Sequence, residues 1–256
     1  MPRVNDMFFD DILKGNIAFI NRELIEGEIK GVCLYFHAFG DEDLIYAPRP
    51  LEFALAKKGI LSAFIFYDVW QFGSDITAKT ADAVYSALCE KFGLKKDIPA
   101  VLFGEGVGAT AALNCARMTD SINLSGCLLA CPVTDLYAHA KARGDMDAVY
   151  FTAFRHLDTD FDSAVDSMSP ILHINEMPDI PYRFILPSEA DPKHHADKYD
   201  RGIVFAEQYD AYINKMKNTG LDASAEIFAF CNCPLPKAIL ESAADTISDM
   251  IAGGQK

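Results

Sequence analysis

Three glycines that alternate with larger residues, Gly104, Gly106 and Gly108, form the stretch of this sequence whose residue types and spacing best suit chemistry. The apolar residues Val101–Phe103 before them predict the end of a buried strand, and the alanine-rich run Ala109–Ala116 predicts a helix packed closely against a sheet. Two chemistries use a glycine-dense turn between a strand and a helix. One is attack by a nucleophilic side chain at the centre of the turn, and the other is the binding of a phosphate group.

The first chemistry requires the pattern G-x-S-x-G, the nucleophile elbow, in which a serine stands on a strained turn. Gly104 and Gly108 match its outer positions, because Cβ atoms there would collide with the neighbouring strand or helix. Gly106 stands where the serine belongs, so the frame of an active site is present without its nucleophile. The second chemistry requires G-x-G-x-x-G, whose third position falls on Ala109, a residue that one variant of that motif tolerates. The stretch alone leaves both interpretations open.

The composition narrows the class of protein. The chain has 256 residues, of which 50% are hydrophobic, enough for the core of one large α/β domain. Its formal net charge of -14 disfavours nucleic acid and anionic membrane surfaces as partners. The first residues contain no long apolar run, and no stretch reaches the length of a membrane span. We therefore expect a cytoplasmic protein with neither nucleic acid nor membrane as a partner.

Cysteines and acidic residues give little support for a metal site. The 7 cysteines are scattered among apolar residues, which predicts reduced thiols in the core. Cys231 and Cys233 form a C-x-C pair without histidines or further cysteines at ligand spacing. The acidic cluster Asp158–Asp162 lacks the glycine and the terminal glutamate of a calcium-binding loop. We expect no metal and no cofactor.

The elements that must position the turn are buried strands alternating with amphipathic helices. This alternation predicts an α/β fold with a largely parallel sheet and helices on both faces. The segment at about 136–177 breaks the rhythm, as a cap-like insertion or a solvated linker would, so we expect one domain over 1–256 with this insertion. Predicted strands cover Ile17–Ile20, Glu23–Glu26, Val32–Phe36, Leu61–Tyr67, Val101–Phe103, Leu124–Cys131, Pro181–Pro187 and Ala225–Cys231, and predicted helices cover Pro48–Lys58, Thr77–Phe92, Ala109–Ala116, Phe205–Asn218 and Pro236–Ala252.

The order of these landmarks resembles an α/β-hydrolase of the esterase and prolyl-oligopeptidase kind, over roughly Gly31–Ile251. The resemblance implies the α/β-hydrolase fold, and with it a triad of Ser, Asp and His at the carboxyl ends of strands. Four segments carry it besides the elbow: His37–Gly40 is similar to the His-Gly oxyanion loop, Asp68–Ser74 to the D-x-R-G-x-G-x-S segment, Ser169–His173 to the S-P stretch of the peptidase branch, and Leu186–Asp191 to the loop of the catalytic acid.

Carried over by this resemblance, the nucleophile position falls on Gly106 and the acid position on Asp191. The histidine should follow the last strand, within Cys231–Pro236, and none is present there. The last histidines, His194 and His195, precede the preceding helix, where a solvated loop is the favoured interpretation.

The oxyanion pair needs no side chain, so it is expected to survive. It would consist of the backbone N–H groups of Val107 and of Ala38 or Phe39. We expect His37 to be structural beneath this loop and Glu105 to point away from the cleft. Trp70 and Phe72 could either line the cleft or cover the core.

These residues predict a catalytically degenerate α/β-hydrolase-like protein that binds a small acyl or peptide-like ligand in the former cleft. Loss of the nucleophile alone costs on the order of 10⁶ in the turnover of a working triad. The alternative is an active serine or cysteine hydrolase of esters or peptides with a displaced nucleophile, for which Ser188, Cys231 and Cys233 are candidates. A nucleotide-binding domain needs an acidic residue about 20 positions beyond the glycines; Asp120 lies closer, and the order of landmarks argues against this class.

Overall fold

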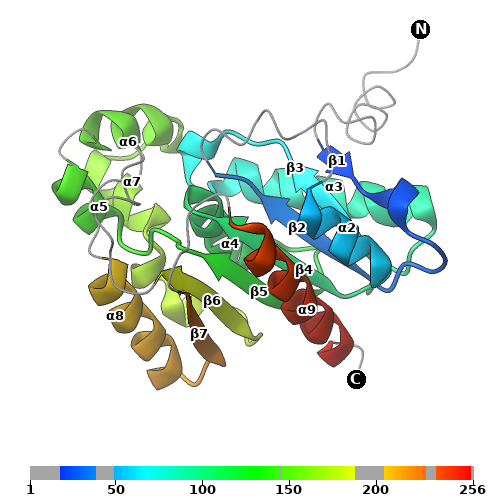
Figure 1. Ribbon diagram of the computed structural model, residues 1–256. Helices are drawn as coiled ribbons and strands as arrows, with labels where there is room; N and C mark the ends of the chain where they lie inside the picture. Colours follow the sequence, from blue (N-terminus) through cyan, green and yellow to red (C-terminus); the bar gives the residue numbers. More distant parts are fainter. Residues whose placement is uncertain (1–17, 39–48, 144–145, 188–204, 229–234, 255–256) are drawn as a thin grey trace, which may run out of the picture.

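In the part of the chain that the structure describes, seven strands form a single sheet in the order β1-β3-β2-β4-β5-β6-β7 (Figure 1). The computed structural model describes residues 18–38, 49–143, 146–187, 205–228 and 235–254. The six strands from β3 to β7 run parallel, and β1 pairs with β3 in the antiparallel sense. The strands are β1 (Ala18–Ile20), β2 (Gly31–Phe36), β3 (Ile60–Ile65), β4 (Ala100–Glu105), β5 (Leu124–Ala130), β6 (Tyr182–Pro187) and β7 (Ala223–Phe228).

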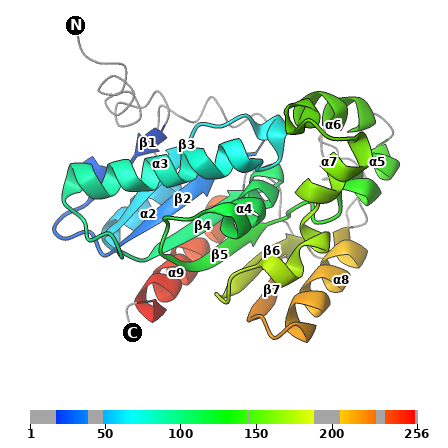
Figure 2. The same cartoon turned by 180° about the vertical axis from the view of Figure 1, so that it is seen from behind.

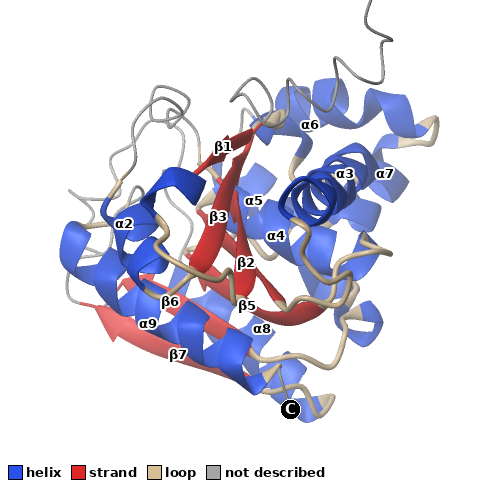
Figure 3. Cartoon of the chain, turned by 90° about the vertical axis from the view of Figure 1, so that its right-hand side faces the viewer, coloured by secondary structure: helices blue, strands red, loops and turns tan. Residues whose placement is uncertain are grey.

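Helices cover both faces of this sheet (Figure 3). Helices α2 (Pro50–Lys57) and α9 (Lys237–Gly253) pack side by side on the face seen in Figure 1. Helices α3 (Asp75–Phe92), α4 (Val107–Met118) and α8 (Phe205–Asn218) cover the opposite face, which Figure 2 shows.

The central strands are apolar throughout because both of their faces are covered. Every residue of β2, β3 and β4 is buried. Along β2, Val32, Leu34 and Phe36 join the core beneath α3 and α4, whereas Cys33 and Tyr35 join the core beneath α2 and α9. This alternation assigns each side chain of the strand to one of two cores.

Short helices connect β5 to β6 at about the place where the βα rhythm breaks. α5 (Leu136–Arg143), α6 (Met146–Phe154) and α7 (Phe161–Met168) lie together at one end of the molecule (Figures 1 and 2). Contacts join α6 to the 3-10 helix η3 (Val69–Gln71), which follows β3. The other 3-10 helices are η1 (Arg22–Leu24), η4 (Arg155–Leu157), η5 (Pro170–Leu172) and η6 (Ile174–Glu176).

The sequence-based prediction of the elements is confirmed for most of the described chain, with ends shifted by a few residues. The strand predicted at Glu23–Glu26 is wrong. Asn21 is buried and its side chain takes backbone partners that a continuing strand would need: Nδ2 donates to Ile60 O at 3.2 Å and Oδ1 accepts from Ser62 N at 2.8 Å. The chain therefore turns into η1. In the described part of the chain, no helix has the length and apolar character that a membrane crossing needs.

Candidate functional site

Gly106 forms a sharp turn between the end of β4 and the start of α4. Its backbone has φ 56° and ψ -124°, a conformation at positive φ that only glycine adopts without strain. Its N–H donates to Ala130 O of β5 at 2.8 Å. The turn places residue 106 at the carboxyl edge of the sheet, where a nucleophile elbow presents its side chain.

The outer glycines are required by close backbone packing, as the sequence predicts. A Cβ on Gly104 would lie 2.6 Å from Ala109 Cα of the following helix. A Cβ on Gly108 would lie 2.5 Å from His37 O and would also collide with Phe36 O. Since carbon atoms keep about 3.5–4.0 Å apart, neither position can carry a side chain without a shift of backbone.

The elbow stands at the switch point of the sheet. From β2 the chain passes through α2 to β3 on one side, and it then returns through α3 to β4 on the other side of β2. Open α/β sheets bind their ligands at the carboxyl ends of the strands beside such a reversal.

The structure describes two of the residues that the sequence predicts for an oxyanion pair. Because Gly108 packs against the carbonyl groups of Phe36 and His37, the start of α4 is in contact with the end of β2. Val107 and Ala38 are next to this contact in the sequence, and both are buried. The N–H groups in the first turn of a helix have no carbonyl partner within that helix, so the amide of Val107 is suited to bind an oxygen atom. Phe39, the other predicted member, lies outside the described residues.

His37 has the surroundings of a structural residue. Its ring is fully buried and stacks on Phe64 with centroids 4.9 Å apart, and it also contacts Tyr67. Nδ1 lies 3.0 Å from Ala38 O, and a carbonyl can only accept, so Nδ1 carries the proton. Phe64 lies in the neighbouring strand β3 and Tyr67 just beyond its end, so the ring is directed away from β4 and the elbow.

The remaining predicted positions are not described by the structure. Asp191, Ser188, His194, His195, Cys231 and Cys233 all fall within residues 188–204 and 229–234. Their roles stay predictions. The structure thus brings together Gly106, Val107 and Ala38, and it does not place the acid.

Glu105 is a residue of the site that the sequence analysis underrated. Its carboxylate is fully buried and lies among partners from three elements (β2, the start of α2 and the start of α9). Tyr35 Oη donates to Oε1 at 2.8 Å, Leu235 N donates to Oε2 at 2.6 Å, and Arg49 Nη1 lies 3.6 Å from Oε1. The available signal was an acidic residue inside a buried strand, which requires compensating donors.

Cys131 is a second residue that the sequence analysis passed over, because it ends an apolar run. It directly follows β5, the strand paired with β4, and has a positive φ of 51°. Cys131 is 8% exposed, and its Sγ lies 3.7 Å from Ile185 O. The other described cysteines, Cys33, Cys89, Cys115 and Cys127, are also buried, and none of the described cysteines forms a disulfide, as expected of core thiols.

Phe72 covers core and does not line a cleft. It is fully buried against Tyr150 and Phe154 of α6, with centroids 5.1 and 6.1 Å away. Asn114 of α4 fixes this segment, since its Nδ2 donates to Phe72 O and to Met168 O, each at 2.9 Å. The side chain of Trp70 lies outside the description.

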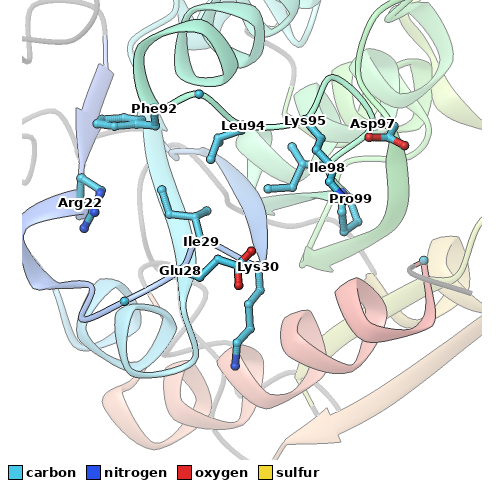
Figure 4. Close-up of a pocket in the computed structure, with 13 residues that line it drawn as sticks. Arg22, Glu28, Ile29, Lys30, Phe92, Leu94, Lys95, Asp97, Ile98 and Pro99 are labelled. Carbon is cyan, nitrogen blue, oxygen red and sulfur yellow. The ribbon is translucent and has the colours of Figure 1, made fainter.

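Two hollows on the described surface lie at opposite edges of the sheet. One of about 550 Å³ lies beyond the carboxyl end of β3, between Asp68, Gln71, Ile76 and the α6 residues Val149 and Ala153. Another, of about 910 Å³, lies at the opposite edge of the sheet (Figure 4). Its charged side chains Arg22, Lys30 and Asp97 stand apart and do not converge on one point. The first hollow is the one on the side of the elbow.

No group of three or more potential metal ligands occurs among the residues that the structure describes. Within the acidic cluster, Asp160 caps α7, because its Oδ1 accepts from Ser163 N at 2.9 Å. Hydrogen bonds to Ser163 hold the carboxyl pKa of Asp160 below its usual value.

Comparisons with known proteins bear on the fold. No family model matches the sequence, and no curated protein matches it. A puromycin hydrolase superposes with a TM-score of 0.64 at 16% identity, covering 89% of this chain and 34% of its own, so this chain spans about a third of that protein. An esterase from Pyrobaculum calidifontis gives 0.59 at 16% identity, covering 88% and 78%, and esterase B from Lactobacillus rhamnosis gives 0.65 at 13%, covering 90% and 80%. The chain therefore has the α/β-hydrolase fold, like puromycin hydrolase and esterases.

Proposed function

We propose that this protein is a catalytically degenerate α/β-hydrolase-like protein that binds a small acyl or peptide-like ligand at the elbow. The observation that carries this proposal is Gly106 itself. The backbone keeps the conformation of a nucleophile elbow, and the residue at its tip has no side chain with which to attack a carbonyl carbon.

The geometry of the backbone supports binding without chemistry. The amide of Val107 and the amide of Ala38 belong to segments in direct contact, and both amides need only the backbone to bind a carbonyl or carboxylate oxygen. The apolar hollow beyond β3, lined by Ile76, Val149 and Ala153, would accommodate an acyl chain or an apolar side chain of a peptide.

An active hydrolase with a displaced nucleophile is the second candidate. Cys131 favours it, because this thiol stands in a strained backbone conformation on the strand beside the elbow. Such an enzyme would need a base within about 3 Å of the thiol. Of the described histidines, His37 and His139 are buried among aromatic rings, and His156 and His173 face Asp75 and Glu176.

Two measurements test the proposal. The first is turnover of short-chain p-nitrophenyl esters by the wild-type protein, Cys131→Ala and Gly106→Ser, each against denatured protein. We expect no saturable turnover by the wild type and little by Gly106→Ser, because an unassisted serine is a poor nucleophile at neutral pH. Adding Asn232→His to Gly106→Ser should raise activity above either single variant, since triad members act as a unit. Wild-type turnover that Cys131→Ala abolishes would instead establish the second candidate.

The second measurement is calorimetric titration with short-chain carboxylates, which are the acyl half of such esters. Binding should weaken in Gly106→Leu, because a branched side chain at the tip of the elbow would fill space that the smaller side chain of serine leaves open. Gly253→Leu, at the end of α9 with no atom within 4 Å of its Cβ, is the matched control and should bind normally. Equal binding by all three proteins would place the ligand elsewhere.

A further inference from the structure

A buried ionic cluster lies directly beneath the elbow, and nothing in the proposed function uses it. It contains Tyr35 of β2, Arg49 and Glu52 at the start of α2, Glu105 of β4 and the backbone N–H of Leu235 before α9. Arg49 lies between the carboxylates, with Nη1 3.6 Å from Glu105 Oε1 and Nη2 3.7 Å from Glu52 Oε1. Its guanidinium covers the ring of Tyr35 at 4.3 Å.

The formal charges of this cluster do not balance. One guanidinium faces two carboxyl groups, and the residues Arg49, Glu52 and Glu105 are only 8%, 3% and 0% exposed. If both carboxyls were ionised, the cluster would bury one uncompensated negative charge, which costs several kcal/mol in a protein interior. Retaining one proton removes this charge, because it leaves a single ion pair with Arg49.

The hydrogen bonds distinguish the two carboxyl groups. Glu105 accepts from Tyr35 Oη and from Leu235 N and lies beside Arg49, as an ionised carboxylate requires. Glu52 uses only Oε2, which accepts from Arg49 N at 2.7 Å. Its Oε1 is buried and has no hydrogen-bond partner among the described residues. Arg49 Nη2 at 3.7 Å is its charged neighbour but does not donate a hydrogen bond to it. A charged oxygen without a hydrogen bond is costlier there than a hydroxyl.

We propose that Glu52 of this protein is protonated at neutral pH and that Glu105 is ionised. The cluster then holds a single proton, and it joins β4, the strand before the elbow, to the starts of α2 and α9. Residue 105 directly precedes Gly106, and its carboxylate holds Leu235. The proton on Glu52 therefore keeps the charge beneath the elbow neutral. Loss of this proton would place a second negative charge beside the Glu105 carboxylate, which accepts a hydrogen bond from Leu235 N.

The groups around Glu52 agree with this assignment. From β2 it faces the thiol of Cys33, and from β4 it faces Glu105. From the start of the chain, uncharged Asn21 donates to Glu52 O at 2.9 Å. Burial raises the pKa of both carboxyls, and it raises that of Glu52 by more than Arg49 lowers it. In a coupled pair the two protons leave in separate steps, and the last to leave belongs to the group with fewer donors.

The test compares the pH dependence of folding in the wild type, Glu52→Gln, Glu105→Gln and Glu241→Gln. Glutamine at 52 mimics the protonated acid, so this variant should fold well. Glu241 is exposed on α9 and provides the matched control. A folded state that holds a proton the unfolded chain releases loses stability as pH rises. Between the ordinary glutamate pKa of about 4.3 and the raised pKa of Glu52 in the folded protein, the equilibrium constant of folding should therefore fall tenfold per pH unit in the wild type relative to Glu52→Gln.

The two glutamines should also differ from each other. Glu105→Gln removes the negative charge opposite Arg49 and leaves one acceptor oxygen for two donors, Tyr35 Oη and Leu235 N. We therefore expect a large loss of stability at every pH, whereas Glu52→Gln should be tolerated. An infrared band of a protonated carboxyl group at pH 7 should be present in the wild type and absent in Glu52→Gln, and this needs no unfolding. Absence of that band from the wild type, or a wild type whose pH profile parallels that of Glu52→Gln, would overturn the proposal. If Glu105→Gln were tolerated and Glu52→Gln were unstable, the proton would belong to Glu105, and this result would also overturn the proposal.

Discussion

Replacing Gly108 by alanine tests whether the close approach of the elbow helix to β2 is a fixed part of this fold. A Cβ there would lie 2.5 Å from His37 O, whereas ordinary contacts begin about 1 Å farther away. Backbone surrounds the new atom, so α4 must move as a body, and every residue from Val107 to Ala116 is buried. Overpacking of this kind costs about 1–3 kcal/mol, and the rigid obstacle favours the upper end.

Alanine also favours a helix over glycine by about 1 kcal/mol, so the net loss should be about 2 kcal/mol. This predicts a fall in Tm of about 4–8 °C for a chain of this size. Gly253→Ala is the matched control, because the same change on α9 meets no atom within 4 Å and should stabilise slightly. Thermal and urea unfolding followed by circular dichroism would measure both variants. A Gly108→Ala protein as stable as the wild type would refute the claim that this contact cannot yield.

Three further predictions follow from single residues. Gly106→Ala should cost about 1–3 kcal/mol in urea unfolding, because its φ of 56° and ψ of -124° strain any side chain, and an unchanged midpoint would contradict the elbow geometry. Asn114→Ala should cost about 2–4 kcal/mol in the same assay, since it leaves the carbonyl groups of Phe72 and Met168 without their buried donor. Arg183 lowers the carboxyl pKa of Asp222, so that pair stabilises the fold above the unfolded pKa of about 3.9 and loses its effect as pH falls through the folded pKa. Asp222→Asn should therefore be less stable than the wild type at pH 6, and the two should converge towards pH 3; a constant difference would exclude the ion pair as the cause.

The elements around the elbow could be predicted because their causes are local. A strand covered on both faces must be apolar at every position, and β2 and β4 show this directly. The outer glycines of the elbow were predictable for the same reason, since contact between neighbouring segments excludes Cβ at Gly104 and Gly108.

Interactions between distant parts of the chain could not be predicted. Glu105 and Leu235 are 130 positions apart, and no periodicity links a buried acid to one particular amide. Asn21 similarly ends β1 through backbone groups of β3, so the pattern at Glu23–Glu26 gave a strand that the fold does not contain. The positive φ of Phe72 also has no local signal, because packing against Tyr150 and Phe154 compensates its strain.

The position of β2 at the switch point of the sheet has a consequence for biosynthesis. β2 pairs with β3 on one side and with β4 on the other, and the ribosome synthesises β3 before β4. Roughly sixty residues separate β2 from β4, so at about 5–20 residues per second the ribosome exposes one edge of β2 for some seconds. During that interval Tyr35 lacks both Glu105 and its stacking partner Phe103. A nascent chain halted before residue 100 should therefore present an unpaired apolar strand edge, the form in which chaperone binding and misassociation compete with folding.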